Sequence, residues 1–127
     1  MEKQNEQPTL EILANGLKKW RLNGQLHRED GPAMELFNGT KFWFQKGQLH
    51  RLDGPAMEYA DGSKQWLQND RLHRLDGPAI ESANGTKQWW INGENLSESE
   101  FNQKIKKLPP KEPKENSLSF FDSLIFD

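Results

Sequence analysis

Three copies of one motif contain the side chains whose types and spacing could do chemistry. Each copy reads Leu-His-Arg-x-Asp-Gly-Pro-Ala, and the copies occupy residues 26–33, 49–56 and 72–79. A histidine near an aspartate could act as a general base oriented by a carboxylate. An active site is one constellation that converges on one point, whereas these copies recur every 23 residues along the chain. We therefore predict that the protein is not an enzyme and has no catalytic residues.

The same repetition argues against a metal centre. The histidines occupy one position per repeat, and neighbouring repeats are expected to lie about two strand spacings, roughly 10 Å, apart. A zinc ion binds histidine nitrogen at roughly 2.0–2.1 Å, so two of these histidines cannot share one ion. The chain also has no cysteine that could supply a thiolate ligand. We expect no metal and no cofactor.

A structural interpretation accounts for the motif more simply. The aspartates would cap the Gly-Pro turn that follows them, and the arginines would pair with neighbouring carboxylates, for which Glu35, Glu58 and Glu81 are candidates. The histidines would then be half-buried residues of the array. One alternative stays open, in which the same rows line a site for an anionic small molecule or nucleotide. Its residues would be His27, Arg28, His50, Arg51, His73 and Arg74.

The charge balance excludes several classes of partner. Lysine and arginine total 17 against 19 aspartates and glutamates, which gives a formal net charge of −2. Such a chain has no field that would draw it onto nucleic acid or an anionic membrane. No apolar run approaches the roughly 20 residues that span a bilayer. We expect no direct nucleic-acid partner, no membrane association and a cytoplasmic location.

The 23-residue period is the signature of a repeat array. Within a repeat, a short segment leads to an Asn-Gly or Asp-Gly pair, then to a strand with a tryptophan, then to a second turn before the motif. Asn-Gly and Asp-Gly are strong hairpin signals because both central residues of a type I′ turn need a positive φ. We predict an all-β fold, a single-layer antiparallel sheet in which successive β-hairpins pair edge to edge.

Side-chain alternation assigns residues to the two faces of this sheet. One face should carry a column of tryptophans that packs the repeats together, Trp20, Trp43, Trp66 and Trp89. The opposite face should carry the equivalent column Arg21, Phe44, Leu67 and Trp90, with Phe42 beside it. The changing character of this second column predicts a partner-binding surface made of Phe42, Phe44, Leu67 and Trp90. A symmetric homodimer is another way to cover such a face.

The fourth copy lacks the motif and continues into a helix signal. Ser97 and Glu100 form a capping box, and Phe101, Ile105 and Leu108 lie roughly on one helical face. A helix here would cover the last strand, whose open edge would otherwise invite aggregation. The predicted organisation is a disordered lead-in (1–8), hairpin repeats (9–96), a capping helix (97–108), a charged linker with prolines (109–116) and an apolar terminal peptide (117–127).

The terminal peptide has two interpretations. Six of its eleven residues are large and apolar. It either folds back onto an exposed face of the sheet or acts as a tethered peptide that fills a groove on another protein. For the second interpretation the partner-binding anchors are Phe120, Phe121, Leu124, Ile125 and Phe126.

The repeat resembles the MORN-like repeats, which are built on a 23-residue β-hairpin unit. It more closely resembles a variant of bacterial, phage and giant-virus proteins with the pattern W-x-x-x-G-x-x-H-R-x-D-G-P-A, which residues 43–56 match in full. The likeness covers about residues 9–103. It departs from the pattern at Asp70, which replaces a turn glycine, and in the fourth copy. The resemblance implies a non-enzymatic scaffold for protein interactions.

The terminal peptide has a resemblance of its own. Residues 119–127 are similar to the short C-terminal peptides by which phage replication and late-transcription proteins hold the sliding clamp. We therefore predict a protein–protein interaction module with which a phage blocks or tethers a host, defence or replisome protein in the host cytoplasm. The alternative function is sequestration of an anionic small molecule or nucleotide.

Overall fold

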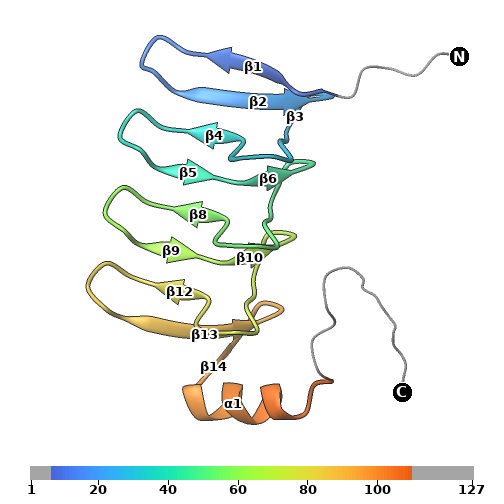
Figure 1. Ribbon diagram of the computed structural model, residues 1–127, viewed down its shortest axis with the longest axis vertical. Helices are drawn as coiled ribbons and strands as arrows, with labels where there is room; N and C mark the ends of the chain where they lie inside the picture. Colours follow the sequence, from blue (N-terminus) through green and yellow to red (C-terminus); the bar gives the residue numbers. More distant parts are fainter. Residues whose placement is uncertain (1–6, 110–127) are drawn as a thin grey trace, which may run out of the picture.

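The computed structural model describes residues 7–109, and the terminal peptide and most of the linker lie outside them. Its strands stack in chain order from the first repeat to a helix at the far end (Figure 1). The elements are β1 (Thr9–Ile12), β2 (Lys18–Leu22), β3 (Gln25–Leu26), β4 (Met34–Glu35), β5 (Lys41–Phe42), β6 (Phe44–Gln45), β7 (Gln48–Leu49), β8 (Met57–Glu58), β9 (Lys64–Gln65), β10 (Leu67–Gln68), β11 (Arg71–Leu72), β12 (Ile80–Glu81), β13 (Lys87–Ile91), β14 (Glu94–Leu96) and α1 (Glu98–Lys106).

The predicted all-β hairpin-repeat fold is confirmed. The main sheet has ten strands in the order β1-β2-β4-β5-β8-β9-β12-β13-β14, with β3 paired to β2. All pairings are antiparallel, and the rows run straight across repeats, for example Met34 opposite Phe42 and Phe42 opposite Met57. The sheet is less continuous than predicted, because β6-β7 and β10-β11 form separate two-stranded ladders. The interruptions fall at Trp43 and Trp66, whose amides bond to Ala56 and Ala79 of the next repeat.

The two turns of a repeat differ from each other, and one differs from the prediction. The first turn is a three-residue loop closed by the Leu36 amide on the Thr40 carbonyl, and in it only Gly39 has a positive φ (95°). Asn38 instead accepts the Thr40 amide with its side chain at 3.0 Å. A type I turn followed by a left-handed glycine closes such loops. The type I′ geometry predicted for the Asn-Gly and Asp-Gly pairs of this turn is therefore wrong.

The second turn does have type I′ character. Both of its central residues have positive φ in every repeat, as the signal for that turn requires. Asp70 takes the place of a glycine with φ 67° and so preserves the turn. Aspartate tolerates this conformation better than most residues. The departure from the repeat pattern at this position leaves the hairpin intact.

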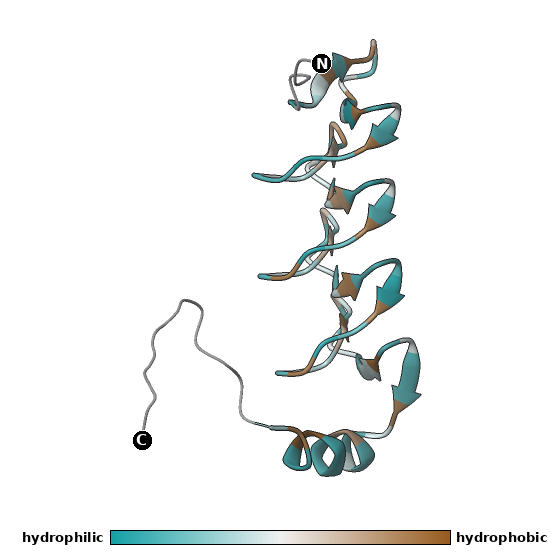
Figure 2. Ribbon diagram, turned by 90° about the vertical axis from the view of Figure 1, so that its right-hand side faces the viewer, coloured by the Kyte–Doolittle hydropathy of each residue, from teal (hydrophilic) through white to brown (hydrophobic). Residues whose placement is uncertain are grey.

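The repeats have no thick core. Turned by 90°, the hairpins form thin rungs stacked one on the next, with apolar and polar stretches alternating along each rung (Figure 2). Most of the large apolar side chains are only partly covered. The buried apolar residues of the described chain are Ala33, Ala56, Leu67, Ala79, Ile91 and Phe101. Packing between neighbouring rungs must therefore provide much of the stability of the array.

Helix α1 closes the array as predicted. Ser97 accepts the Glu100 amide at 3.0 Å, and the Glu100 carboxylate accepts the Ser97 amide at 2.9 Å, which completes the capping box. Phe101 is buried at 5% exposure, whereas Leu108 is 44% exposed. The helix contacts β13 and β14 and so covers the last rung. Its end leaves Leu108 facing the surface described next.

Candidate binding groove

Each complete motif holds its arginine over the tryptophan ring of the same repeat. The Arg51 guanidinium lies 3.8 Å from the ring centre of Trp43. Its Nε donates to Asp53 at 3.1 Å and its Nη1 donates to the Pro55 carbonyl at 3.0 Å and to Glu58 at 3.3 Å. We call this set of contacts the arginine clamp. The equivalent clamps stack Arg28 on Trp20 and Arg74 on Trp66.

The clamps test the structural interpretation of the motif. The predicted pairing with Glu35, Glu58 and Glu81 is confirmed, at N–O distances of 3.6, 3.3 and 3.1 Å. The predicted capping of the Gly-Pro turn is wrong for Asp30 and Asp53. Asp30 and Asp53 accept hydrogen bonds from the arginine, not from the backbone of the following turn.

The glycine and alanine of the motif are the residues that the clamp can accommodate. A Cβ placed on Gly54 would lie 2.7 Å from Cζ of Arg51, so the guanidinium would have to move out of the clamp to admit it. The φ of Gly54 lies outside the left-handed region, so glycine is required here by the arginine and not by the backbone. Ala56 is fully buried at 0% exposure, where its amide bonds to Gln65 and its carbonyl accepts from Trp43. A larger side chain has no space there.

The histidines connect each repeat to the next. His50 Nδ1 accepts the Asn69 amide at 3.0 Å, and His73 Nδ1 accepts the Asn92 amide at 3.0 Å. His27 does the same with Lys46 at 2.9 Å. Each bond is made by the first residue of the next type I′ turn, so the imidazole fixes the register of neighbouring rungs. Because Nδ1 accepts, the proton of each neutral ring lies on Nε2.

Acidification should loosen the contact made by His73. Burial lowers the pKa of His73 from its ordinary 6.5, because desolvation disfavours the imidazolium. The imidazole therefore takes up a proton more readily in the unfolded chain than in the folded one. The stabilisation that the neutral ring provides is complete above about pH 6.5 and is lost as the pH falls through the lower pKa of the folded state. We expect the urea concentration at the unfolding midpoint to be lower at about pH 5.5 than at about pH 7.5. His73→Gln should show a smaller fall, and identical pH profiles would contradict the assignment.

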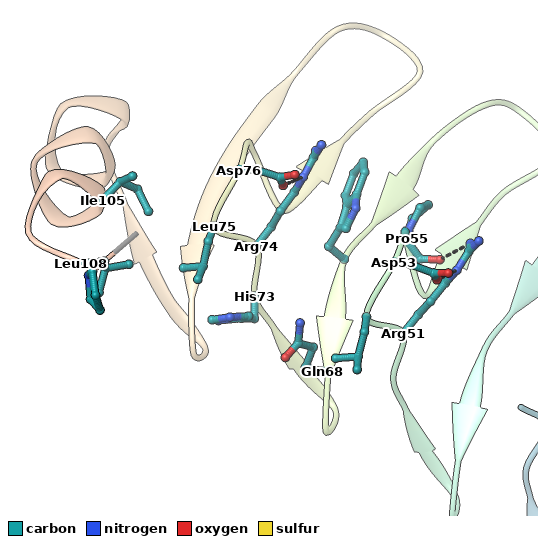
Figure 3. A pocket seen from close by; sticks show the side chains of 14 residues that line it. Arg51, Asp53, Pro55, Gln68, His73, Arg74, Leu75, Asp76, Ile105 and Leu108 are labelled. Carbon is teal, nitrogen blue, oxygen red and sulfur yellow. Dashed lines mark hydrogen bonds and ion pairs between the residues drawn. The ribbon is translucent and has the colours of Figure 1, made fainter. Parts of the chain in front are cut away.

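A groove runs between the second and third motifs and ends at α1. Its volume is about 810 Å³. Figure 3 shows Leu75 beside Ile105 and Leu108 of the helix end, with His73 and Gln68 between them and Arg51. We call it the inter-repeat groove. Its lining residues are Arg51, Leu52, Asp53, Gly54, Pro55, Trp66, Gln68, His73, Arg74, Leu75, Asp76, Ile105, Leu108 and Pro109.

A second groove of about 680 Å³ continues the first toward the N-terminal end of the array. The two share Arg51, Leu52 and Asp53, so together they form one track along successive motifs. The variable motif position changes along this track, from Glu29 through Leu52 to Leu75. The track is therefore acidic at one end and apolar at the other.

The sequence did not predict the exposed apolar side chains of the groove. Leu52 is 75% exposed and Leu75 is 43% exposed, although both are leucines in an otherwise clamped motif. The signal was available, because the x position of His-Arg-x-Asp is the one that varies between copies. Exposed leucines close together on a small protein commonly mark an interaction surface. Clustering with Leu108 could not be anticipated without the fold.

The residues predicted to bind a partner through the sheet face are largely covered. Phe42 packs edge-on against Tyr59 with ring centres 5.8 Å apart. Phe44 and Trp90 are partly buried, and Leu67 is 7% exposed and so offers little surface. The remaining predicted anchors, Phe120, Phe121, Leu124, Ile125 and Phe126, lie outside the described residues.

The residues of the alternative anion site already have partners within the array. The arginine side chains are only 20–23% exposed and each contacts two carboxylates. His27 is buried at 4% exposure, and its Nε2 donates to Glu29 at 3.2 Å. An incoming anion would have to displace these carboxylates.

Comparison with protein-family models, with curated proteins and with solved structures found no match. Between residues 7 and 109, no cluster of three or more histidines and carboxylates is arranged to hold a metal ion. No helix in that range is long and apolar enough to cross a membrane.

Proposed function

We propose that this protein is a non-enzymatic binding module that holds a segment of another protein in the inter-repeat groove. The observation that carries the proposal is the exposure of Leu52 at 75%, in the same groove as Leu75 and Leu108. Fully burying a leucine stabilises a complex by roughly 1.5–3 kcal/mol. Two such anchors supply a large part of a micromolar affinity, which corresponds to about 8.2 kcal/mol.

The arginine clamps support a binding role for the x position of the motif. Their polar groups are used within the repeat, so the motif supplies a rigid scaffold and leaves the x position to meet a partner. Sites whose supporting side chains are already held in place lose less conformational entropy on binding. The alternative of an anion-sequestering protein has weaker support, because Arg51 and Arg74 already contact paired carboxylates.

The biological setting of the proposal rests on resemblance. We propose that the array is a MORN-like module that acts in the cytoplasm, where it blocks or tethers a host, defence or replisome protein for a phage. Its terminal peptide would be a second binding element, with a sliding clamp as its partner. This setting is an analogy at the level of the repeat and the peptide.

The groove can be tested with charge substitutions at its leucines. Full-length wild-type protein and the L52E/L75E variant are used to capture partners from extracts of the source cells. The variant should lose at least about tenfold in captured partner, because each buried charge costs more than the apolar contact it replaces. Both side chains are exposed in the free protein, so its unfolding midpoint should be unchanged.

Phe37→Glu is the control for a negative charge added outside the groove. Phe37 is 80% exposed at a first turn and does not line the groove. This variant should capture as much partner as the wild type. Equal loss in both variants would indicate a non-specific response to added negative charge, and full capture by L52E/L75E would refute the groove as the binding site.

A further inference from the structure

We propose that the occupant of the groove is a segment of a partner protein in the polyproline II conformation, with apolar anchors at every third residue and a basic residue three positions further on. This inference rests on the proposed function and names the chemistry of its partner. It follows from the spacing of the anchoring positions, from unused hydrogen-bond donors and from the charge at the end of the track.

The spacing favours a polyproline II segment over a β-strand. Each repeat adds two strands to the main sheet, so Glu29, Leu52 and Leu75 are expected at intervals of about 10 Å. Three residues of polyproline II span about 9.3 Å and return to the same face. Same-face residues of a β-strand recur at about 6.8 Å, which does not match the interval.

Hydrogen-bond donors in the groove favour polyproline II over an α-helix, whose seven-residue interval of about 10.5 Å also fits. His73 Nδ1 accepts a hydrogen bond from the Asn92 amide, so the Nε2–H of His73 remains as a donor. The side-chain amide of Gln68, which also lines the groove, makes no hydrogen bond with residues 7–109. Polyproline II leaves all its carbonyls open to such donors, whereas the carbonyls inside an α-helix are already bonded. Pro55 and Trp66 supply the apolar lining that proline-rich segments prefer.

The negative charge at the far end of the track favours a segment of a partner protein over this chain's own linker as the occupant of the groove. Glu29 and Asp30 line it, with side chains 77% and 89% exposed. A basic residue six positions from the first anchor would lie over them. The linker has prolines at 110 and 113 but asparagine at 116, and these residues lie outside the described chain. The linker therefore has apolar residues at the required three-residue spacing but lacks a basic residue three positions further on.

The probe is the peptide Leu-Pro-Pro-Leu-Pro-Pro-Arg, titrated against the full chain by calorimetry. Its spacing control, Leu-Pro-Leu-Pro-Pro-Pro-Arg, keeps the composition and moves one anchor. The first peptide should bind at least about tenfold more tightly than the control, and L52E/L75E should remove the difference. Glu29→Lys should weaken binding of the first peptide roughly threefold, as expected for the loss of an exposed ion pair. A peptide that ends in glutamate in place of arginine should recover this affinity with the Glu29→Lys variant.

Several results would overturn the inference and leave the proposed function standing. One is preferential binding of a helical peptide with leucines seven residues apart. Another is equal binding of the two proline peptides while capture from extracts still depends on the groove leucines. Binding that appears only in a P110G/P113G full-length variant would assign the groove to the chain's own linker. If capture itself is indifferent to L52E/L75E, the proposed function fails as well.

Discussion

Replacing Arg51 with alanine should lower the free energy of unfolding by about 3 kcal/mol. The variant loses the stack on Trp43 and three hydrogen-bonded contacts, and it leaves the Pro55 carbonyl without its donor. A cation–π contact contributes about 0.5–2 kcal/mol and a hydrogen bond to a charged group about 1.5–3 kcal/mol, which partial exposure reduces here. Small domains have about 5–15 kcal/mol in total, so the loss is severe.

Urea unfolding monitored by tryptophan fluorescence measures this effect. The matched control is Arg21→Ala, because Arg21 makes a wider ion pair of 3.6 Å with Glu11 and both side chains are 41–50% exposed. That variant should change stability by less than about 1 kcal/mol. If Arg51→Ala were as mild as the control, the clamp would not be a structural element, and the arginine row would again be available for an anionic ligand.

Gly54→Ala should cost about 2 kcal/mol, although it adds only one methyl group. The new Cβ would displace the Arg51 guanidinium, which lies 2.7 Å away, and would break the clamp. The free energy lost is bounded by the clamp contacts themselves. Gly24→Ala has no atom within 4 Å of the added Cβ but a φ of 80°, so it measures the cost of a left-handed backbone, which Gly54 does not have.

A double-mutant cycle separates the two causes. In an Arg51→Ala background the obstacle is gone, so Gly54→Ala should cost less than about 0.5 kcal/mol. A coupling of roughly 1.5 kcal/mol between the two positions is therefore expected. Additive effects would show that Gly54 is needed for its own backbone conformation, contrary to the geometry of the motif.

The sequence predicted those features that local chemistry and periodicity determine. The 23-residue period gave the hairpins, and Ser97 with Glu100 gave the helix and its cap, because both signals lie within a few residues of the structure they specify. The Arg–Glu pairing within a repeat was also predicted correctly. These elements depend on residues that are near one another in the chain.

The features that the sequence did not predict arise from contacts in three dimensions. The stack of Arg51 on Trp43 joins residues eight positions apart across the second turn of the repeat, and the bond from Asn69 to His50 joins two repeats. Asn38-Gly39 was assigned the wrong turn because loop length, not the dipeptide, selected the geometry. The exposure of Leu52 was not predicted, because it results from the contacts that hold its clamp neighbours Arg51 and Asp53 in place.

Hydrogen–deuterium exchange of the full chain, with and without the protein it captures, would show where on the array the partner lies. If the partner lies in the inter-repeat groove, amide exchange should slow within residues 51–54 and 73–77 and at the end of α1. Protection confined to the strands of Phe42, Phe44 and Trp90, or to residues 117–127, would refute the inter-repeat groove as the binding site.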